Sequence, residues 1–449
     1  MSRYTAVTPE DLREMLATIG VGSIDELFDR QVPAGVRLGR PLDLPAGLPE
    51  QAVYEHLRDL AAKNTSTEDE ITFLGAGMYD TYVPAIMDML MERSEFLTPY
   101  TPYQPEISQG GLQVMFEYQT AISELTALPV SNASVYEGPS ALGAAGYLAK
   151  LANGKRRFVI SAGVHPHSRE TLRTMAHGYE MEVVEVPLRD GVTDRDAWHA
   201  AIDGDTSGVF LQQPNFLGAV EDVEALAVDE PVVVAQVDPL TLGILKPPGE
   251  CGVDVAVGEG QQLGNRLDYG GPSFGFFAAT EAYLRRMPGR IAGETKDVDG
   301  RRGFVLTLQT REQHIRRERA TSNICTAQAL NALGGVVYLS WLGRRGIVEL
   351  GELLLQRTAY ARERLAALDG VELLHEQPVV REFAVRLDAP AARVVERCQA
   401  EGVNPGHPLE DDGLLVALTE RRSRADIDRL ADVLGSAVAA ERRRVEVPA

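Results

Sequence analysis

The segment from Val232 to Phe276 decides the fold. It contains two apolar runs, VVVAQVD (Val232–Asp238) and GVDVAV (Gly252–Val257), followed by a glycine-rich turn, GGPSFGF (Gly270–Phe276). Continuous runs of Val and Ala bounded by Pro, Asp and Gly are typical of strands that are buried on both faces. Such strands belong to parallel sheets with helices on both sides. We therefore expect this segment to lie at the centre of an α/β domain.

The same rhythm extends over the preceding part of the chain. We expect strands at Phe158–Ser161, Glu182–Val186, Val209–Gln212, Val232–Val237 and Val253–Val257. Helical patterns alternate with them near residues 139–152, 168–177, 194–202 and 219–227. Beyond about residue 315 the pattern changes to long helices (326–342 and 347–368), strands at Val371–Leu374, Val379–Leu387 and Leu414–Leu418, and helices from Ala391 and Arg424. We predict a helical N-terminal arm (1–70), a large parallel-sheet domain (71–315) and a small C-terminal α/β domain (316–449).

The segment also lacks a lysine where its layout calls for one. The order of strand, acidic residue, strand and glycine turn resembles aspartate-aminotransferase-like domains, the fold type I of pyridoxal-phosphate (PLP) transferases. In that family a lysine shortly after the second strand forms an imine with the cofactor. Counting from Asp254 places this position at or near Gln262, and a carboxamide cannot form an imine. The acidic partner of the cofactor ring falls near Ala235, and Asp238 is the nearest carboxylate.

A second unusual stretch is TPYTPYQPEISQGG (Thr98–Gly111), which we call the strap. Proline at every third position favours polyproline II geometry with three residues per turn. In that geometry Tyr100, Tyr103 and Glu106 share one edge, so two phenols and a carboxylate are presented in a row. Ser108 is placed to cap a long helix predicted through Leu128. A rigid surface segment whose tyrosines merely pack is the alternative.

Two weaker candidates precede the central segment. A small-residue turn in front of a helix, ending at Ser140, offers free N–H groups that can hold a phosphate, although a plain tight turn explains it as well. His165 and His167 follow a strand end, where open α/β sheets place their ligands. They could form an aromatic lid over a planar cofactor or have no role. We predict no metal site, because no third ligand of matching spacing is evident.

Several of these stretches together resemble the P-protein of the glycine cleavage system, in its N-terminal half or, where the protein is split, its subunit 1. The similarity covers nearly the whole chain. Its most specific parts are Phe73–Pro84, Thr98–Gly110, Asn132–Ser140, Gly270–Phe276 and Ala320–Gln328. In that family the lysine lies in a sister subunit or in the second half of a fused chain, so the resemblance accounts for its absence here.

The resemblance implies an enzyme that acts as a complex. The complete P-protein decarboxylates glycine on PLP and passes the aminomethyl group to the lipoyl arm of the H-protein. This chain would be the lysine-free partner of the PLP-bearing subunit 2 in a heterodimer or heterotetramer, inactive alone and without a cofactor of its own. Two groups of residues would contribute to the shared site: Tyr100, Tyr103, Glu106 and Ser108 across the interface, and Thr321, Ser322 and Asn323 from the small domain. Gln262, His165, His167 and Ser140 would be remnants of an emptied cofactor site.

Two other functions remain open at this point. One is a stand-alone PLP-dependent decarboxylase with Lys246 as its imine-forming lysine. The other is a non-enzymatic scaffold or regulator that kept the fold and lost the chemistry.

Composition excludes some classes of protein. With 44% hydrophobic and 24% charged residues among 449, the chain has the composition of a soluble globular protein. The net charge of −21 argues against nucleic acid or an anionic membrane as partner. No apolar run approaches the roughly 20 residues of a membrane span. The N-terminus lacks the layout of a signal peptide, and Cys251, Cys325 and Cys398 are not in metal-type pairs, so we expect a cytoplasmic protein.

The basic residues are unevenly divided, since lysine occurs only at Lys63, Lys150, Lys155, Lys246 and Lys296. An acidic, lysine-poor surface suits a salt-loving host, because salt screens self-repulsion, but a GC-rich genome explains the deficit equally well. If the host is salt-loving, the free energy of unfolding, measured in urea, will rise between low and molar sodium chloride. An unchanged value rejects that origin.

Overall fold

The structure, a computed structural model, describes residues 6–325 and 327–446. They belong to two compact units, which divide between Thr65 and Ser66. The first unit contains α1 (Pro9–Ile19), α2 (Ile24–Gln31), the 3-10 turn η1 (Ala34–Val36) and α3 (Glu50–Ala61). The domain boundaries predicted at 70/71 and 315/316 stay predictions.

A seven-stranded sheet forms the centre of the second unit. In spatial order its strands are β2 (Val130–Ser131), β10 (Gly275–Ala279), β9 (Val255–Glu259), β8 (Val232–Val237), β7 (Thr206–Gln213), β3 (Arg157–Ser161) and β4 (Glu182–Val186). The five strands from β9 to β4 are parallel, as the apolar runs predicted, whereas β10 is antiparallel to both of its neighbours. The sequence of β10 predicts only the end of a glycine turn, so this strand is not expected from its residues.

Alternate side chains of the central strands face two different helix layers. Val232 and Val234 pack in one cluster with residues of α7 (Gly138–Asn153) and α8 (Pro166–Gly178). Val233 and Ala235 belong to a second cluster, which includes residues of α6 (Gln109–Thr126) and α12 (Ala329–Ala366). The period of two in a strand thus places a hydrophobic side chain on each face, which is why β8 is apolar except for Gln236.

Shorter elements surround this sheet. The helices are α4 (Ala85–Met91), α5 (Ser94–Leu97), α9 (Arg195–Ala201), α10 (Val223–Leu226) and α11 (Gln313–Arg316), and the hairpins are β5 (Leu188–Arg189) with β6 (Val192–Thr193) and β11 (Ile291–Lys296) with β12 (Arg302–Thr307). The helix predicted over 219–227 is only as long as α10. Its first residues instead pair with the C-terminal part, where the Val220 N–H donates to the Pro378 carbonyl at 2.8 Å.

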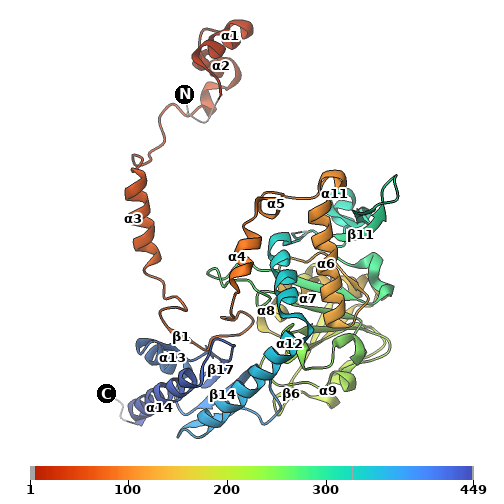
Figure 1. The fold of residues 1–449 in the computed structure, drawn as a ribbon, viewed down its shortest axis with the longest axis vertical. Coiled ribbons are helices and arrows are strands. Elements are labelled where there is room, and N and C mark those ends of the chain that lie inside the picture. The colour runs from red at the N-terminus through yellow and green to blue at the C-terminus, as the bar shows by residue number, and fades with distance from the viewer. Residues whose placement is uncertain (1–5, 326, 447–449) are drawn as a thin grey trace. The chain divides into compact units, whose positions relative to one another are not determined.

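The C-terminal part contains a smaller, antiparallel sheet. Its strands lie in the order β13 (Val371–Leu373), β14 (Glu382–Leu387), β17 (Gly413–Ala417) and β16 (His407–Pro408), and α13 (Ala391–Ala400) and α14 (Arg424–Glu446) complete it. The chain enters the second unit beside this sheet, because β1 (Ile71–Thr72) pairs with β15 (Val403–Asn404). Figure 1 shows α14 and β17 beside the end of α12.

Helix α12 connects the two sheets. It runs from the region of α4 and α6 to β13 and α14 and has residues in both hydrophobic cores (Figure 1). The two helices predicted here are joined at Gly343, whose φ of 61° and ψ of −177° are not helical. Thr326, where the first was expected to begin, lies outside the described residues.

The close contact at Gly218 yields a stability prediction. Gly218 has φ +86°, and a Cβ there would lie 1.9 Å from the Glu382 carbonyl oxygen of β14. We expect Gly218→Ala to lower the free energy of unfolding by about 3 kcal/mol or more, because the loop between β7 and α10 must move away from the backbone of β14. Urea unfolding of the full chain measures the loss.

Gly402→Ala is the matched control. Gly402 has φ +73° but nothing within 4 Å of the added methyl group, so only the left-handed backbone costs free energy, about 1–2 kcal/mol. Equal losses in the two variants would show that the approach of Gly218 to β14 is not tight.

Candidate functional site

A crevice lies at the carboxyl ends of β8 and β9, where parallel α/β sheets place ligands. Its volume is about 360 Å³, and it is lined by Ala76, Gly77, Met78, Tyr136, Glu137, Pro139, His165, His167, Gln236, Glu259, Gly270, Gly271, Pro272, Ser273 and Gln328. Segments that are far apart in the sequence therefore meet here, including the glycine turn, the start of α7 and the histidines before α8.

The position expected for a lysine is occupied by a buried amide. Gln262 Nε2 donates to Asp238 Oδ1 at 3.1 Å. The structure thus brings together the two residues that counting along the chain had marked. Ala235 itself points away from the crevice into the core. Its neighbour Gln236 faces the crevice instead, with its Oε1 buried and without a partner among the described residues. An amide therefore stands where an acidic partner was expected.

Asp238 is engaged by an arginine that directly precedes β14 of the smaller sheet. Arg381 Nε donates to Asp238 Oδ2 at 2.5 Å, and the guanidinium carbon lies 3.5 Å from the centre of the Tyr79 ring. Tyr79 Oη in turn donates to Glu382 Oε2 at 2.8 Å. Burial is the main cause that raises the pKa of Glu382. The cluster joins β8, β14 and the loop through Tyr79, so it fixes the wall behind Gln262.

Carboxylates occupy the donors at the start of α7. The Ser140 N–H donates to Glu137 Oε1 at 2.8 Å, and the Gly138 N–H donates to Glu259 Oε2 at 2.9 Å. Glu259 also accepts from the Gln261 N–H at 3.1 Å and from the Ser273 hydroxyl. Burial raises the pKa of Glu259 to about 7. Ser140 therefore acts as part of a capping box, and its helix does not present free donors.

His165 is held at the side of the crevice. Its Nε2 lies 2.8 Å from the Ala76 carbonyl oxygen, and its ring packs edge-on against Phe216. Burial lowers the pKa of His165 to about 4, so the imidazole is neutral at pH 7. His167 is exposed beside it, and its N–H donates to His165 Nδ1 at 3.1 Å. Both predicted histidines thus line the crevice.

These side chains do not match PLP chemistry. The cofactor needs a lysine amine for the imine, an acid for its ring nitrogen and donors for its phosphate. In the crevice, the amide of Gln262 stands at the position expected for the lysine, and the amide of Gln236 stands near the position expected for the ring acid. At the α7 N-terminus the crevice offers carboxylates in place of free donors.

The three side chains that the sequence places on one edge of the strap are exposed. Tyr100 is 90% and Tyr103 75% exposed, and Glu106 is exposed as well. The polyproline II segment is interrupted, because the Tyr103 N–H donates to the Thr101 carbonyl at 2.9 Å and a 3-10 turn, η2 (Pro105–Ile107), follows. Ser108 stands at the N-cap of α6, but its side chain makes no capping hydrogen bond, contrary to our expectation.

Two residues that we did not predict anchor the strap. Gln109 Nε2 donates to the Pro105 carbonyl at 2.7 Å and to the Phe304 carbonyl at 2.8 Å, and its Oε1 accepts from the Phe304 N–H. The buried Arg290 donates to Thr101 Oγ1. The hairpin β11–β12 and the residue that precedes it therefore hold the strap backbone while the two phenols point outward.

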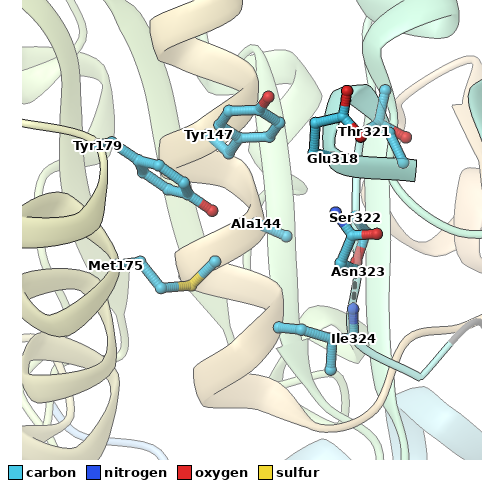
Figure 2. A pocket seen from close by; sticks show the side chains of 10 residues that line it. Ala144, Tyr147, Met175, Tyr179, Glu318, Thr321, Ser322, Asn323 and Ile324 are labelled. Atoms are coloured by element: carbon cyan, nitrogen blue, oxygen red, sulfur yellow. Dashed lines mark hydrogen bonds between the residues drawn. The ribbon is translucent and has the colours of Figure 1, made fainter. Parts of the chain in front are cut away.

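Thr321, Ser322 and Asn323 lie elsewhere. They line a second pocket of about 180 Å³ together with Tyr147 and Tyr179, whose rings stack 4.7 Å apart. Figure 2 shows the three residues on one side of this pocket. On the other side lie Tyr147 of α7, Met175 of α8 and Tyr179, which directly follows α8. None of the three lines the crevice that contains Glu259.

Lys246 is a surface residue. It forms an ion pair with Glu224 and lines neither pocket. The hydrogen bond that Lys246 donates to Glu224 raises the pKa of Lys246, which is the wrong direction for an imine-forming amine. Over residues 6–325 and 327–446, the structure contains no group of three or more His, Cys, Asp or Glu side chains that could hold a metal ion. Nor does a helix in these ranges have the length and apolar character to cross a membrane.

Comparison with known proteins identifies the family. A family model described as the glycine cleavage system P-protein matches residues 2–434. This chain belongs to the glycine cleavage system P-protein family. The "Probable glycine dehydrogenase (decarboxylating) subunit 1" of Geotalea uraniireducens is 48% identical over 446 residues, which cover 97% of this chain and 100% of that protein. The protein of that name from Carboxydothermus hydrogenoformans is 48% identical over 442 residues, with 96% and 99% covered.

Solved structures agree. A crystal structure of glycine decarboxylase (P-protein) in inhibitor-bound form is 40% identical, with a TM-score of 0.90, and covers 97% of this chain and 100% of that one. Sphingosine-1-phosphate lyase of Burkholderia pseudomallei (17% identical, TM-score 0.64, 92% of this chain and 96% of that one) shares the fold alone. So does glutamate decarboxylase of Lactobacillus brevis (13%, 0.66, 91% and 96%). The predicted aspartate-aminotransferase-like fold and the resemblance to the P-protein family are confirmed.

Reasoning from sequence missed Arg381, Glu259 and Gln109. Arg381 and Gln109 act on residues more than 140 positions away, so no local pattern marks them. Glu259 carried a signal, because a carboxylate at the end of an apolar strand that opens into a ligand crevice is unusual.

The ion pair between Arg381 and Asp238 predicts how the free energy of unfolding of this P-protein subunit changes when one of the two charges is removed. Removing the cation with Arg381→Met leaves Asp238 partly buried without its partner, so we expect the free energy of unfolding in urea to fall by about 3–5 kcal/mol. The double variant Asp238→Asn/Arg381→Met should regain most of that loss. Arg345→Met, which breaks an exposed pair with Glu349, is the control and should cost about 0.5 kcal/mol or less. A double variant no more stable than Arg381→Met contradicts this interpretation.

Glu259 predicts a pH dependence. Its folded pKa of about 7 exceeds the ordinary value of 4.5, so between these pH values the folded state binds more protons than the unfolded state. Stability contributed by the protonated carboxyl is therefore lost as pH rises through this window. Glu259→Gln lacks that loss. We expect the unfolding free energy of the variant to rise relative to the natural chain by about 3 kcal/mol across the window, measured by urea unfolding. If the difference in unfolding free energy between Glu259→Gln and the natural chain did not change with pH, the Glu259 carboxyl would be hydrated and its pKa would not be raised by burial.

Proposed function

We propose that this chain is the cofactor-free subunit of a glycine-cleaving P-protein. In the complex, a PLP-bearing second subunit decarboxylates glycine and transfers the aminomethyl group to the lipoyl arm of the H-protein. The lipoyl disulfide is reduced in this step, because its S–S bond opens as the aminomethyl group binds one sulfur and the carboxyl group leaves as carbon dioxide. Family membership and the subunit 1 names of the relatives support this assignment.

One observation carries the division of labour between subunits. Gln262 occupies the lysine position and donates to Asp238, while Arg381 takes the other oxygen of that carboxylate. A cofactor bound here would have no amine to form an imine with. The PLP of the complex therefore belongs to the partner subunit. The free thiols of Cys251, Cys325 and Cys398 support a reducing compartment, and we place the complex in the cytoplasm.

The strap is our candidate for the contribution of this chain to the shared site. Tyr100 and Tyr103 expose nearly whole phenol rings on a backbone fixed by Gln109 and Arg290. Phenols can hydrogen-bond a carboxylate or phosphate while their rings exclude water. Glu106 and Ser108 lie along the same segment. Thr321, Ser322 and Asn323 are a second, separate contribution.

The two other functions fit this structure less well. A stand-alone decarboxylase would need Lys246, which is paired with Glu224 on the surface. A scaffold without any role in the reaction would have no use for two exposed tyrosines on an anchored backbone.

Reconstitution with the second subunit tests the proposal. We expect glycine-dependent release of carbon dioxide only when both chains are present. Tyr100→Phe and Tyr103→Phe should each lower the rate at least about tenfold, because a hydroxyl that faces the reacting groups is lost. Tyr283→Phe, in the 3-10 turn η5 (Glu281–Arg286) after β10, is the control and should leave the rate unchanged.

Three outcomes would contradict the proposal. Full activity of both strap variants would remove the strap from the site. Full activity of the second subunit alone would favour the scaffold function. Activity of this chain alone would favour the stand-alone decarboxylase.

A further inference from the structure

The start of α7 is where this crevice could accept an anion. Helix α7 has 16 residues, and its first turn lines the crevice through Glu137 and Pro139. The N–H groups and the partial positive charge of a helix N-terminus favour a phosphate. Pro139 has no N–H, so Gly138 and Ser140 are the donors of the first three helical residues.

Both donors are already bonded to carboxylates of this chain. Glu137 accepts from Ser140, as in an ordinary helix cap. Glu259 is different, because it comes from β9, whose end lies directly beside Gly138, and its side chain accepts from the Gly138 N–H. Its second oxygen accepts from Ser273 in the glycine turn and from the Gln261 N–H. One carboxylate thus bonds to three segments that a bound phosphate would otherwise bridge.

Side chains do not fill the crevice, so they do not exclude a phosphate sterically. About 360 Å³ remains beside Glu259, and Gln236 faces this space with an unpartnered oxygen among the described residues. Exclusion of a phosphate must therefore be electrostatic. A phosphate carries about −1.5 to −2 charges. At the first turn of α7 it would come close to the carboxylates of Glu137 and Glu259, which accept hydrogen bonds there.

We propose that the carboxylate of Glu259 takes the place of a cofactor phosphate at the N-terminus of α7, and that it keeps phosphorylated ligands out of this chain independently of the missing lysine. The inference deepens the proposed function, in which this subunit holds no cofactor. It assigns that property to a specific negative charge as well as to Gln262. It also explains how α7, β9 and the glycine turn stay joined without a ligand.

The experiment introduces the lysine and varies the phosphate. The full chain carrying Gln262→Lys, in complex with the second subunit, is incubated with pyridoxal or with PLP at about pH 8, above the pKa of Glu259, and imines are reduced with borohydride. Peptide mapping by mass spectrometry measures labelling at residue 262. We expect pyridoxal to label at least as well as PLP. In Gln262→Lys/Glu259→Gln the preference should reverse, with PLP labelling about tenfold more than pyridoxal.

A control and a second readout complete the test. Gln262→Lys/Glu230→Gln, which neutralises an exposed carboxylate paired with Lys155, should behave like Gln262→Lys. Binding of inorganic phosphate to the full chain, followed by phosphorus NMR, should be at least about tenfold tighter in Glu259→Gln than in the natural chain.

The outcomes separate this inference from the proposed function. PLP labelling Gln262→Lys about tenfold better than pyridoxal while Glu259 is present would overturn the inference, and so would unchanged phosphate binding in Glu259→Gln. If the Glu259→Gln chains do not fold, the comparison of pyridoxal with PLP on Gln262→Lys decides alone. Labelling of the natural chain at a lysine would instead overturn the proposed function.

Discussion

The pairing of Arg381 with Asp238 holds the two sheets of the second unit against each other. Arg381 directly precedes β14 of the smaller sheet and is only 2% exposed, so its charge would be very unfavourable without a partner. Asp238 follows β8 of the large sheet and supplies the negative charge, and the face of Tyr79 covers the guanidinium. Because an arginine stays charged at any physiological pH, this junction is permanent. The crevice wall, the loop through Tyr79 and the position of Gln262 all depend on it.

Around this junction the fold of a cofactor enzyme is kept while its charges are changed. Amides stand at the positions where the sequence predicts a lysine and a ring acid, and a carboxylate stands at the helix terminus that suits an anion. The overall fold matches that of the P-protein structure with a TM-score of 0.90. In the function that we propose, this architecture serves for its shape, and the strap is the surface that it positions.

The strands of the parallel sheet could be predicted because they are buried on both faces. A continuous apolar run such as VVVA in β8 is typical of such strands, and it can be recognised from the local sequence alone. Helices α7 and α8 were predictable from their spacing and caps. β10 was not, since its glycines indicate a turn and its pairing with β2 and β9 is set by distant residues. For the site, the proline repeat predicts an extended segment at Tyr100 and Tyr103, but a hydrogen bond from the Tyr103 N–H to Thr101 and a 3-10 turn interrupt it. The partners of Gln262, Glu259 and Gln109 are established only by folding, and no local rule gives them.

Helix α12 adds a mechanical property to this arrangement. Its bend at Gly343 arises from one backbone conformation, with no side chain packed into the corner. The arm before Gly343 packs in the core of the large sheet, and so does the beginning of the second arm, through Leu350 and Leu354. The end of the second arm packs in the core of the smaller sheet, through Ala361 and Leu365. One uninterrupted stretch of helix is therefore fixed in both cores, and a displacement of either sheet is passed along it to the other.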